Sequence, residues 1–273
     1  MPIFDSAALN EGVRKREVFG WAMYDFANSG YTTVVLTAVF NAYFVGVIAG
    51  NASWATLAWT SALALSSAVV MLTMPSLGAL ADLRAAKKRL LAFSTVGCVL
   101  ATALLALTGP GDLWLAMAAI IVSNIFYSYG ESLTAAFLPE LARREALGRV
   151  SGWGWSFGYF GGMLSLGLSL AYVLWAQGQG LRAEQFVPVT MVITAVVYAA
   201  ASLATFALLR ERAQAQPGPV AGLRDSLARL AETWREARRF RDFSWLLATA
   251  LAYQAGIAVV IALAAVYAEQ VLG

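Results

Sequence analysis

Long apolar stretches alternate with short polar links along this chain. A bilayer core about 30 Å thick requires about 20 apolar residues in a helix. Seven stretches are long enough, and they predict spans at residues 20–45, 54–81, 90–108, 113–136, 152–176, 187–209 and 243–269. The alternating segments of about ten residues that build membrane barrels are absent. We therefore predict an all-α membrane bundle, because only helices and closed barrels pair their backbone groups in lipid.

The composition agrees with this prediction. Hydrophobic residues make up 60% of the 273 residues and charged residues 13%, whereas a soluble domain has about 45–50% and about 25%. The chain has no histidine and one cysteine, Cys98, which lies in an apolar stretch. These counts exclude His-based triads and zinc clusters. We expect no catalytic residues, no metal site and no cofactor, and we read Cys98 as a small buried hydrophobe.

The basic residues indicate the orientation. Eighteen of the 19 Lys and Arg lie before the first span or in the links after spans two, four and six, whereas Arg182 lies in a link on the other side. Basic residues accumulate on the cytoplasmic side of membrane proteins. The sequence therefore predicts a cytoplasmic N-terminus.

The polar segment 210–242 is the longest one outside the spans. Pro217-Gly218-Pro219 breaks any helix that continues from the sixth span. Four apolar residues then recur at helical spacing: Leu223, Leu227, Leu230 and Trp234. The segment is either an amphipathic interfacial helix that joins two halves of a bundle or a solvated linker. Five acidic residues dilute its basic run and argue against nucleic-acid binding.

Two carboxylic residues, Asp25 and Glu131, fall within predicted spans. A charge at the bilayer centre costs about 2.5–3.5 kcal/mol, and the cost is lower toward the cytoplasmic ends of the spans, where both residues fall. Asp25 shares a helix face with Asn28 and Thr32, and Glu131 shares one with Asn124. These stripes could line a solute or ion pathway, in which carboxylates would have to carry any proton. Alternatively, each acid is a hydrogen-bonded group that fixes helix packing.

The fifth span begins with glycines spaced four residues apart. Gly154, Gly158 and Gly162, together with Gly161, form a repeated small-residue pattern. Such patterns allow two membrane helices to approach closely. Tight packing is the simpler interpretation, and a helix that slides or rocks against its neighbour is the other.

Span two ends in Gly78-Ala79-Leu80-Ala81-Asp82, and Lys87-Lys88-Arg89 follow in the link to span three. This pattern resembles the loop signature of the major facilitator superfamily, although Leu83 and Ala85-Ala86 replace a base and the second glycine of that signature. In that superfamily the loop is a conformational latch. The resemblance implies a cytoplasmic gate, to which we also assign Glu140 as a partner of the bases; its residues are Gly78, Asp82, Arg84, Lys87, Lys88, Arg89, Glu140 and Arg149.

Two further strings resemble the vacuole-effluxer-like, autophagy-related branch. They are residues 21–31 in the first span and residues 138–162, which include Leu138-Pro139-Glu140. The resemblance implies a permease or effluxer of small polar solutes, amino acids among them, in a bacterial cytoplasmic membrane. Spans one, four and seven would line its cavity, and the pathway candidates are Tyr24, Asp25, Asn28, Thr32, Asn124, Tyr127, Glu131 and Gln254. An Asn-Asp-Gly string expected in span seven is replaced by Gln254-Ala255-Gly256.

The superfamily has twelve spans, so the resemblance implies a six-helix N-terminal half and the first helix of the second half. The expected organisation is a cytoplasmic segment at 1–19, a six-span bundle at 20–209, a linker at 210–242 and the seventh span at 243–273. Expected partners are membrane lipids, a small solute that is proton-coupled, and the missing spans 8–12 or a second chain, but no nucleic acid. The alternatives are an accessory half-transporter subunit and a non-transporting membrane protein or receptor. A membrane enzyme lacks any supporting residues.

Overall fold

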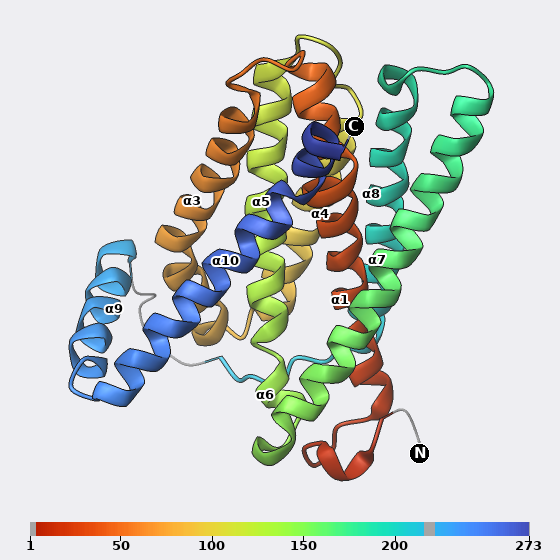
Figure 1. Ribbon diagram of the computed structural model, residues 1–273. Coiled ribbons are helices and arrows are strands. Elements are labelled where there is room, and N and C mark those ends of the chain that lie inside the picture. Colours follow the sequence, from red (N-terminus) through yellow and green to blue (C-terminus); the bar gives the residue numbers. More distant parts are fainter. Residues whose placement is uncertain (1–3, 216–221, 273) are drawn as a thin grey trace.

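The computed structural model describes residues 4–215 and 222–272. In this part of the chain, all the secondary-structure elements of the fold are helices. Seven helical segments are long and apolar enough to cross a membrane, which confirms the seven predicted spans and the all-α fold class. The first span is continuous from Lys15 to Ile48 and begins with α1 (Lys15–Tyr31). The later spans are α3 (Ala55–Leu83), α4 (Lys87–Leu105), α5 (Leu113–Ala135), α7 (Leu147–Gly178), α8 (Ala183–Leu208) and α10 (Arg241–Leu272) (Figure 1).

Several helix ends lie a few residues from the predicted span boundaries. The third span was predicted at 90–108, but α4 begins at Lys87 and ends at Leu105. The three basic residues that were assigned to the link form its first turn. They are long side chains with good helix propensity, and their charge does not prevent a helix from starting.

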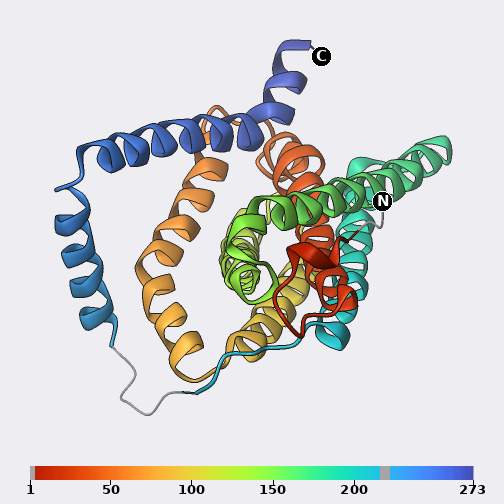
Figure 2. The same ribbon diagram turned by 90° about the horizontal axis from the view of Figure 1, so that it is seen from below.

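Helix α1 lies between its neighbours at the centre of the bundle. It packs against α7 and α8, while α4 packs against α5 and α8, and α3 packs against α5 (Figure 2). The large buried side chains include Tyr24 and Tyr31 of α1 and Trp59 of α3. The first six spans thus form one packed body around α1.

Helices α1 and α7 meet along the glycine stripe of α7. A Cβ atom on Gly161 would lie 2.0 Å from the Phe26 carbonyl oxygen, and one on Gly158 would lie 2.7 Å from Ser29 Oγ. A Cβ atom on Gly154 or Gly162 would likewise lie under 3.0 Å from a side chain of the first span. The two backbones therefore approach so closely that a methyl group has no room between them.

The second half of the first span departs from α-helical geometry. Thr32–Ala38 and Phe44–Ile48 are π-helical, and the short helix α2 (Phe40–Tyr43) separates them. The Val39 amide, for example, donates to the Val34 carbonyl five residues earlier at 3.0 Å. π-helical turns are rare, and they occur frequently at functional sites.

The last two helices lie at the edge of the bundle. Helix α9 (Leu223–Ala237) contacts α3, and α10 contacts Thr32–Ala38 and α2 of the first span (Figure 1). Trp234 of α9 is exposed. Pro217-Gly218-Pro219 and the side chains of Leu223, Leu227 and Leu230 lie outside the described residues. Many apolar side chains of α10, such as Leu251, are exposed.

Helix α3 ends in a left-handed turn that is built with alanine. The Ala86 amide donates to the Ala81 carbonyl at 2.9 Å, and the Ala85 amide donates to the Asp82 carbonyl at 3.4 Å. This is the Schellman motif, whose left-handed position is usually glycine. Ala85 occupies that position with φ +47°. The motif therefore carries the strain of a side chain in the left-handed region.

Replacing Gly161 by Ala is expected to destabilise the bundle. The new methyl group would meet the Phe26 carbonyl at 2.0 Å, and such overpacking costs about 1–3 kcal/mol. Unfolding in mixed detergent micelles measures this loss. Gly167→Ala is the matched control, since a Cβ there meets nothing within 4 Å; equal stability of the two variants would contradict the close contact.

Replacing Ala85 by Gly is expected to stabilise the protein. Relief of the left-handed alanine is worth about 1 kcal/mol, and the same unfolding measurement would detect it. Ala86, at φ −119°, is the control, because Gly at that position removes no strain and should give no gain. A gain of equal size at both positions would refute the proposed strain.

Candidate functional site

A polar cavity of about 410 Å³ lies between the first span, α5 and α7. Five of the eight predicted pathway residues line it: Asp25, Asn28, Thr32, Tyr127 and Glu131. The first three follow one face of the first span, and the other two lie one turn apart on α5. The structure thus brings the polar face of the first span and part of the α5 stripe to the same cavity.

Hydrogen bonds and stacking join these two walls. Thr32 Oγ1 donates to the Tyr127 hydroxyl at 3.0 Å. The Tyr127 ring stacks on the Tyr31 ring with their centroids 4.9 Å apart, and the Tyr31 hydroxyl lies 2.8 Å from Ser123 Oγ. The α5 wall is therefore held in a fixed position against the first span, and the carboxyl groups project from ordered walls.

The third wall of the polar cavity comes from α7. Gly158 and Gly162 of the glycine stripe line it, and Trp155, Tyr159 and Met163 line it beside them. The Trp155 and Tyr159 rings meet edge to face with their centroids 6.3 Å apart. Trp155 is 66% exposed and Tyr159 is 68% exposed. This wall therefore offers aromatic faces that the rest of the described chain does not cover.

Three predicted pathway residues lie elsewhere. The Tyr24 side chain is fully buried, and its hydroxyl lies 3.0 Å from Thr95 Oγ1 of α4. Asn124 is buried as well and donates from Nδ2 to Ser66 Oγ of α3 at 2.6 Å. Gln254 is exposed on α10 and is not among the residues that line the polar cavity. Tyr24 and Asn124 are engaged in contacts between helices.

Sequence reasoning missed Tyr198 of α8, which does not line the polar cavity but contacts a residue that does. Its hydroxyl donates to Asn28 Oδ1 at 2.7 Å and lies 3.2 Å from the Tyr24 hydroxyl oxygen. Tyr198 is buried, and so is Asn28. The signal was present, since Tyr198 is a phenol in the middle of an apolar span and a buried phenol usually finds a hydrogen-bond partner.

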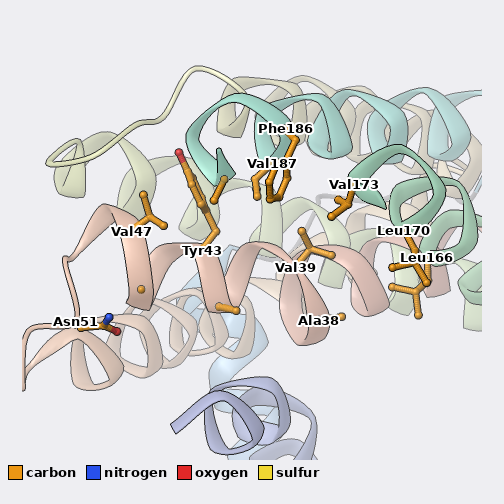
Figure 3. A pocket seen from close by; sticks show the side chains of 13 residues that line it. Ala38, Val39, Tyr43, Val47, Asn51, Leu166, Leu170, Val173, Phe186 and Val187 are labelled. Atoms are coloured by element: carbon orange, nitrogen blue, oxygen red, sulfur yellow. The ribbon is translucent and has the colours of Figure 1, made fainter. Parts of the chain in front are cut away.

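A second cavity, of about 370 Å³, lies farther along the seam between the first span and α7. Figure 3 shows its lining side chains, which are mainly apolar and include Val39, Val173 and Phe186. Tyr43 is among them, and its hydroxyl donates to the Thr108 carbonyl at 3.2 Å. Leu166 lines both cavities. The seam is therefore polar at one end and apolar at the other, with Leu166 between them.

Lys87 lies at the centre of a cluster of charges at one end of the bundle. Its Nζ atom is 3.1 Å from Asp82 Oδ1 and 3.0 Å from Glu140 Oε1. Glu140 belongs to the short helix α6 (Leu138–Leu141) that follows α5. The structure thus places Glu140 against one of the bases that the sequence assigned to the gate. The Lys87 and Glu140 side chains are largely buried, whereas Asp82 is exposed.

Residues just after α8 complete this charge cluster. The Glu211 carboxylate accepts from the Lys87 and Lys88 amides at 2.7 and 3.1 Å, at the start of α4. Lys88 Nζ donates to the Leu209 carbonyl at 2.6 Å, at the end of α8. A carboxylate thus lies at the N-terminus of α4 and an ammonium at the C-terminus of α8, where the helix dipole favours each charge. Sequence reasoning missed Glu211, because it pairs across more than 120 residues.

A buried ion pair lies beside the cluster. Arg212 Nη2 is 2.7 Å from Glu17 Oε2, and the Glu17 side chain is 1% exposed. The Arg212 amide also donates to Glu140 Oε2 at 2.9 Å. Charged side chains of α1 and α6 thus hold the beginning of the linker against these two helices. Sequence reasoning did not single out Glu17 or Arg212.

The other residues assigned to the gate lie outside the Lys87 cluster. Arg84 and Arg89 are exposed, and Gly78 has open space around its Cβ position. Arg149 Nη1 pairs with Asp5 Oδ2 at 2.9 Å on the N-terminal segment. The Ala7 amide, which donates to Asp5, lowers the pKa of that carboxyl below its usual value, and Arg149 adds to the effect.

Comparison with known proteins gives one match among curated sequences. The chain is 28% identical over 255 residues to the "Uncharacterized MFS-type transporter YxiO" of Bacillus subtilis (strain 168). The match covers 90% of this chain and 59% of the relative, so the chain spans less than two thirds of the length of that protein. No solved structure matches.

The family comparison covers most of the chain and includes the α5 and α7 walls of the polar cavity. The profile described as "Vacuole effluxer Atg22 like" matches residues 42–273. Seven apolar helices and a relative named as a transporter identify an integral membrane protein. The chain belongs to the vacuole effluxer Atg22-like family.

Proposed function

We propose that this chain is part of a secondary active transporter that moves small polar solutes, amino acids among them, by alternating access. The observation that carries the proposal is the polar cavity that Asp25 of the first span and Glu131 of α5 both line. Transporters of this kind bind their solute at a midplane site between two bundles that rock against each other. Family membership and the name of the Bacillus relative support the proposal.

The two carboxyl groups are the coupling groups in this proposal. Each can hold a proton or release it as the cavity opens to one side and then to the other. In the described part of the chain, neither Asp25 nor Glu131 forms an ion pair that would fix its charge. Both are therefore free to change protonation state during a transport cycle.

The Lys87 cluster is the gate in this proposal. Lys87 joins Asp82 at the end of α3 to Glu140 in α6, while Glu211 holds the start of α4. These contacts join four segments at one end of the six-span body, and a second bundle would open and close against this end. The basic residues at this end support a cytoplasmic location for it and for the N-terminus, in a bacterial membrane.

Reconstitution of the full-length protein in liposomes tests the transport function. A pH-sensitive dye inside the liposomes should report proton flux that depends on an added solute, with amino acids screened first. Asp25→Asn and Glu131→Gln should each reduce this coupled flux at least tenfold, because neither side chain can then exchange a proton. The exposed Glu145 gives the matched control Glu145→Gln. Unchanged coupling in both cavity variants would remove the acids from the mechanism, and absence of any solute flux would refute the function.

Cysteine labelling in right-side-out membrane vesicles tests the orientation. The native Cys98 is fully buried, so it should stay unlabelled under native conditions. A cysteine at Gln179, in the link between α7 and α8, should react with a membrane-impermeant maleimide. A cysteine at Glu145, before α7, should react only after the membrane is permeabilised. The reverse pattern would invert the proposed topology.

A further inference from the structure

Two carboxyl groups on different helices line the polar cavity. They belong to Asp25 of α1 and Glu131 of α5, and they interact electrostatically when ionised. None of the described lining residues is a lysine or arginine. Like charges that face each other in a medium of reduced dielectric repel, and a cation between them would relieve the repulsion. The walls therefore favour a positively charged group over a neutral or anionic one.

Asn28 adds a hydrogen-bond donor to the lining of this cavity. Asn28 lines the cavity and is 4% exposed. Its Oδ1 atom accepts from the Tyr198 hydroxyl at 2.7 Å, whereas in the described part of the chain its amide nitrogen has no hydrogen-bond partner. This nitrogen is not among the described buried atoms that lack a partner, so it is accessible from the cavity that Asn28 lines. It can donate to an acceptor oxygen on a bound molecule.

The α7 wall adds an aromatic surface. Trp155 and Tyr159 line the polar cavity and meet edge to face. A cation over an indole or phenol ring gains about 0.5–1 kcal/mol at an exposed site and more when it is desolvated. Carboxylates on two walls and aromatic rings on the third are complementary to one chemical group, an ammonium.

We propose that the polar cavity binds a solute that carries a primary ammonium group. Asp25 and Glu131 hold the ammonium between them, and the Trp155 ring covers it. A hydroxyl, carbonyl or carboxylate oxygen of the same solute accepts from the Asn28 amide. An ammonium has three N–H donors, enough for both carboxylates and one cavity hydroxyl. This proposal rests on the transport function proposed above and adds the chemistry that selects the solute.

Binding of small probes to the purified full-length protein in detergent tests the site. Ethanolammonium carries the ammonium and an acceptor hydroxyl, ethylene glycol is its neutral counterpart, and glycolate is its anionic one. Calorimetry and intrinsic tryptophan fluorescence should show saturable binding of ethanolammonium. Ethylene glycol and glycolate should bind at least tenfold more weakly. Ethylammonium, which lacks the acceptor oxygen, should bind severalfold more weakly than ethanolammonium.

Three variants locate the ligand. Asp25→Asn and Glu131→Gln should each weaken ethanolammonium binding at least tenfold, while Glu145→Gln leaves it unchanged. Trp155→Leu should weaken binding about threefold, as expected for loss of a cation–π contact. Trp155 is 66% exposed, so this variant should fold as the wild type does. Circular dichroism and elution profiles check the folding of each variant.

The outcomes separate this proposal from the transport function. Equal binding of glycolate and ethanolammonium, or no binding of ethanolammonium, overturns the ammonium site. Binding that survives all three cavity substitutions places the ligand elsewhere and also overturns it. If liposomes containing the protein still transport another solute in these cases, the transport function stands without the ammonium site.

Discussion

The close contact between α1 and α7 determines the arrangement of the rest of the bundle. At Gly161 the α7 backbone lies against the Phe26 carbonyl with no room for a methyl group. This approach brings Asp25 and Thr32 of the first span beside the aromatic side chains of α7, and α5 closes the polar cavity on the other wall. In lipid, where apolar surfaces gain little by leaving the solvent, such close backbone contact is a main source of helix association.

The ends of the helices are held by a different kind of interaction. Lys87, Glu140 and Glu211 place opposite charges at helix termini and against each other, and Arg212 pairs with the buried Glu17. Removing one member of a buried pair leaves a charge without compensation, which costs more than the pair contributes when it is intact. The charge cluster therefore makes the positions of α3, α4, α6 and the beginning of the linker interdependent. The glycine seam fixes the middle of the bundle, and the charges fix one end of it.

Much of the fold could be predicted because a helix that crosses lipid requires a long apolar stretch of sequence. The seven spans followed from apolar length alone. Periodicity also placed Asp25, Asn28 and Thr32 on one face, and the structure puts all three in one cavity with Glu131. Periodicity cannot tell which polar group faces a cavity and which faces a neighbouring helix. Tyr24 and Asn124 have the same chemistry as the cavity residues, yet each bonds to a partner more than 50 residues away.

Sequence reasoning missed other residues for the same reason. Tyr198 and Glu211 act through partners that lie far along the chain, at Asn28 and at the start of α4. Such partners become visible only when the helices are assembled. The loop signature pointed to Asp82 and Lys87, but not to Arg212 or Glu17, because these lie outside the loop.

The π-helical turns of the first span limit what a helical wheel can say about it. A π-helical turn holds more residues than an α-helical turn, so each one rotates the following residues about the helix axis. The face shared by Asp25, Asn28 and Thr32 ends where the first π-helical segment begins. Beyond it, Val39 and Tyr43 line the apolar cavity instead. One continuous span can therefore present a polar wall to one cavity and an apolar wall to the other. A substitution that converts a π-helical turn to an α-helical one would change which residues line each cavity.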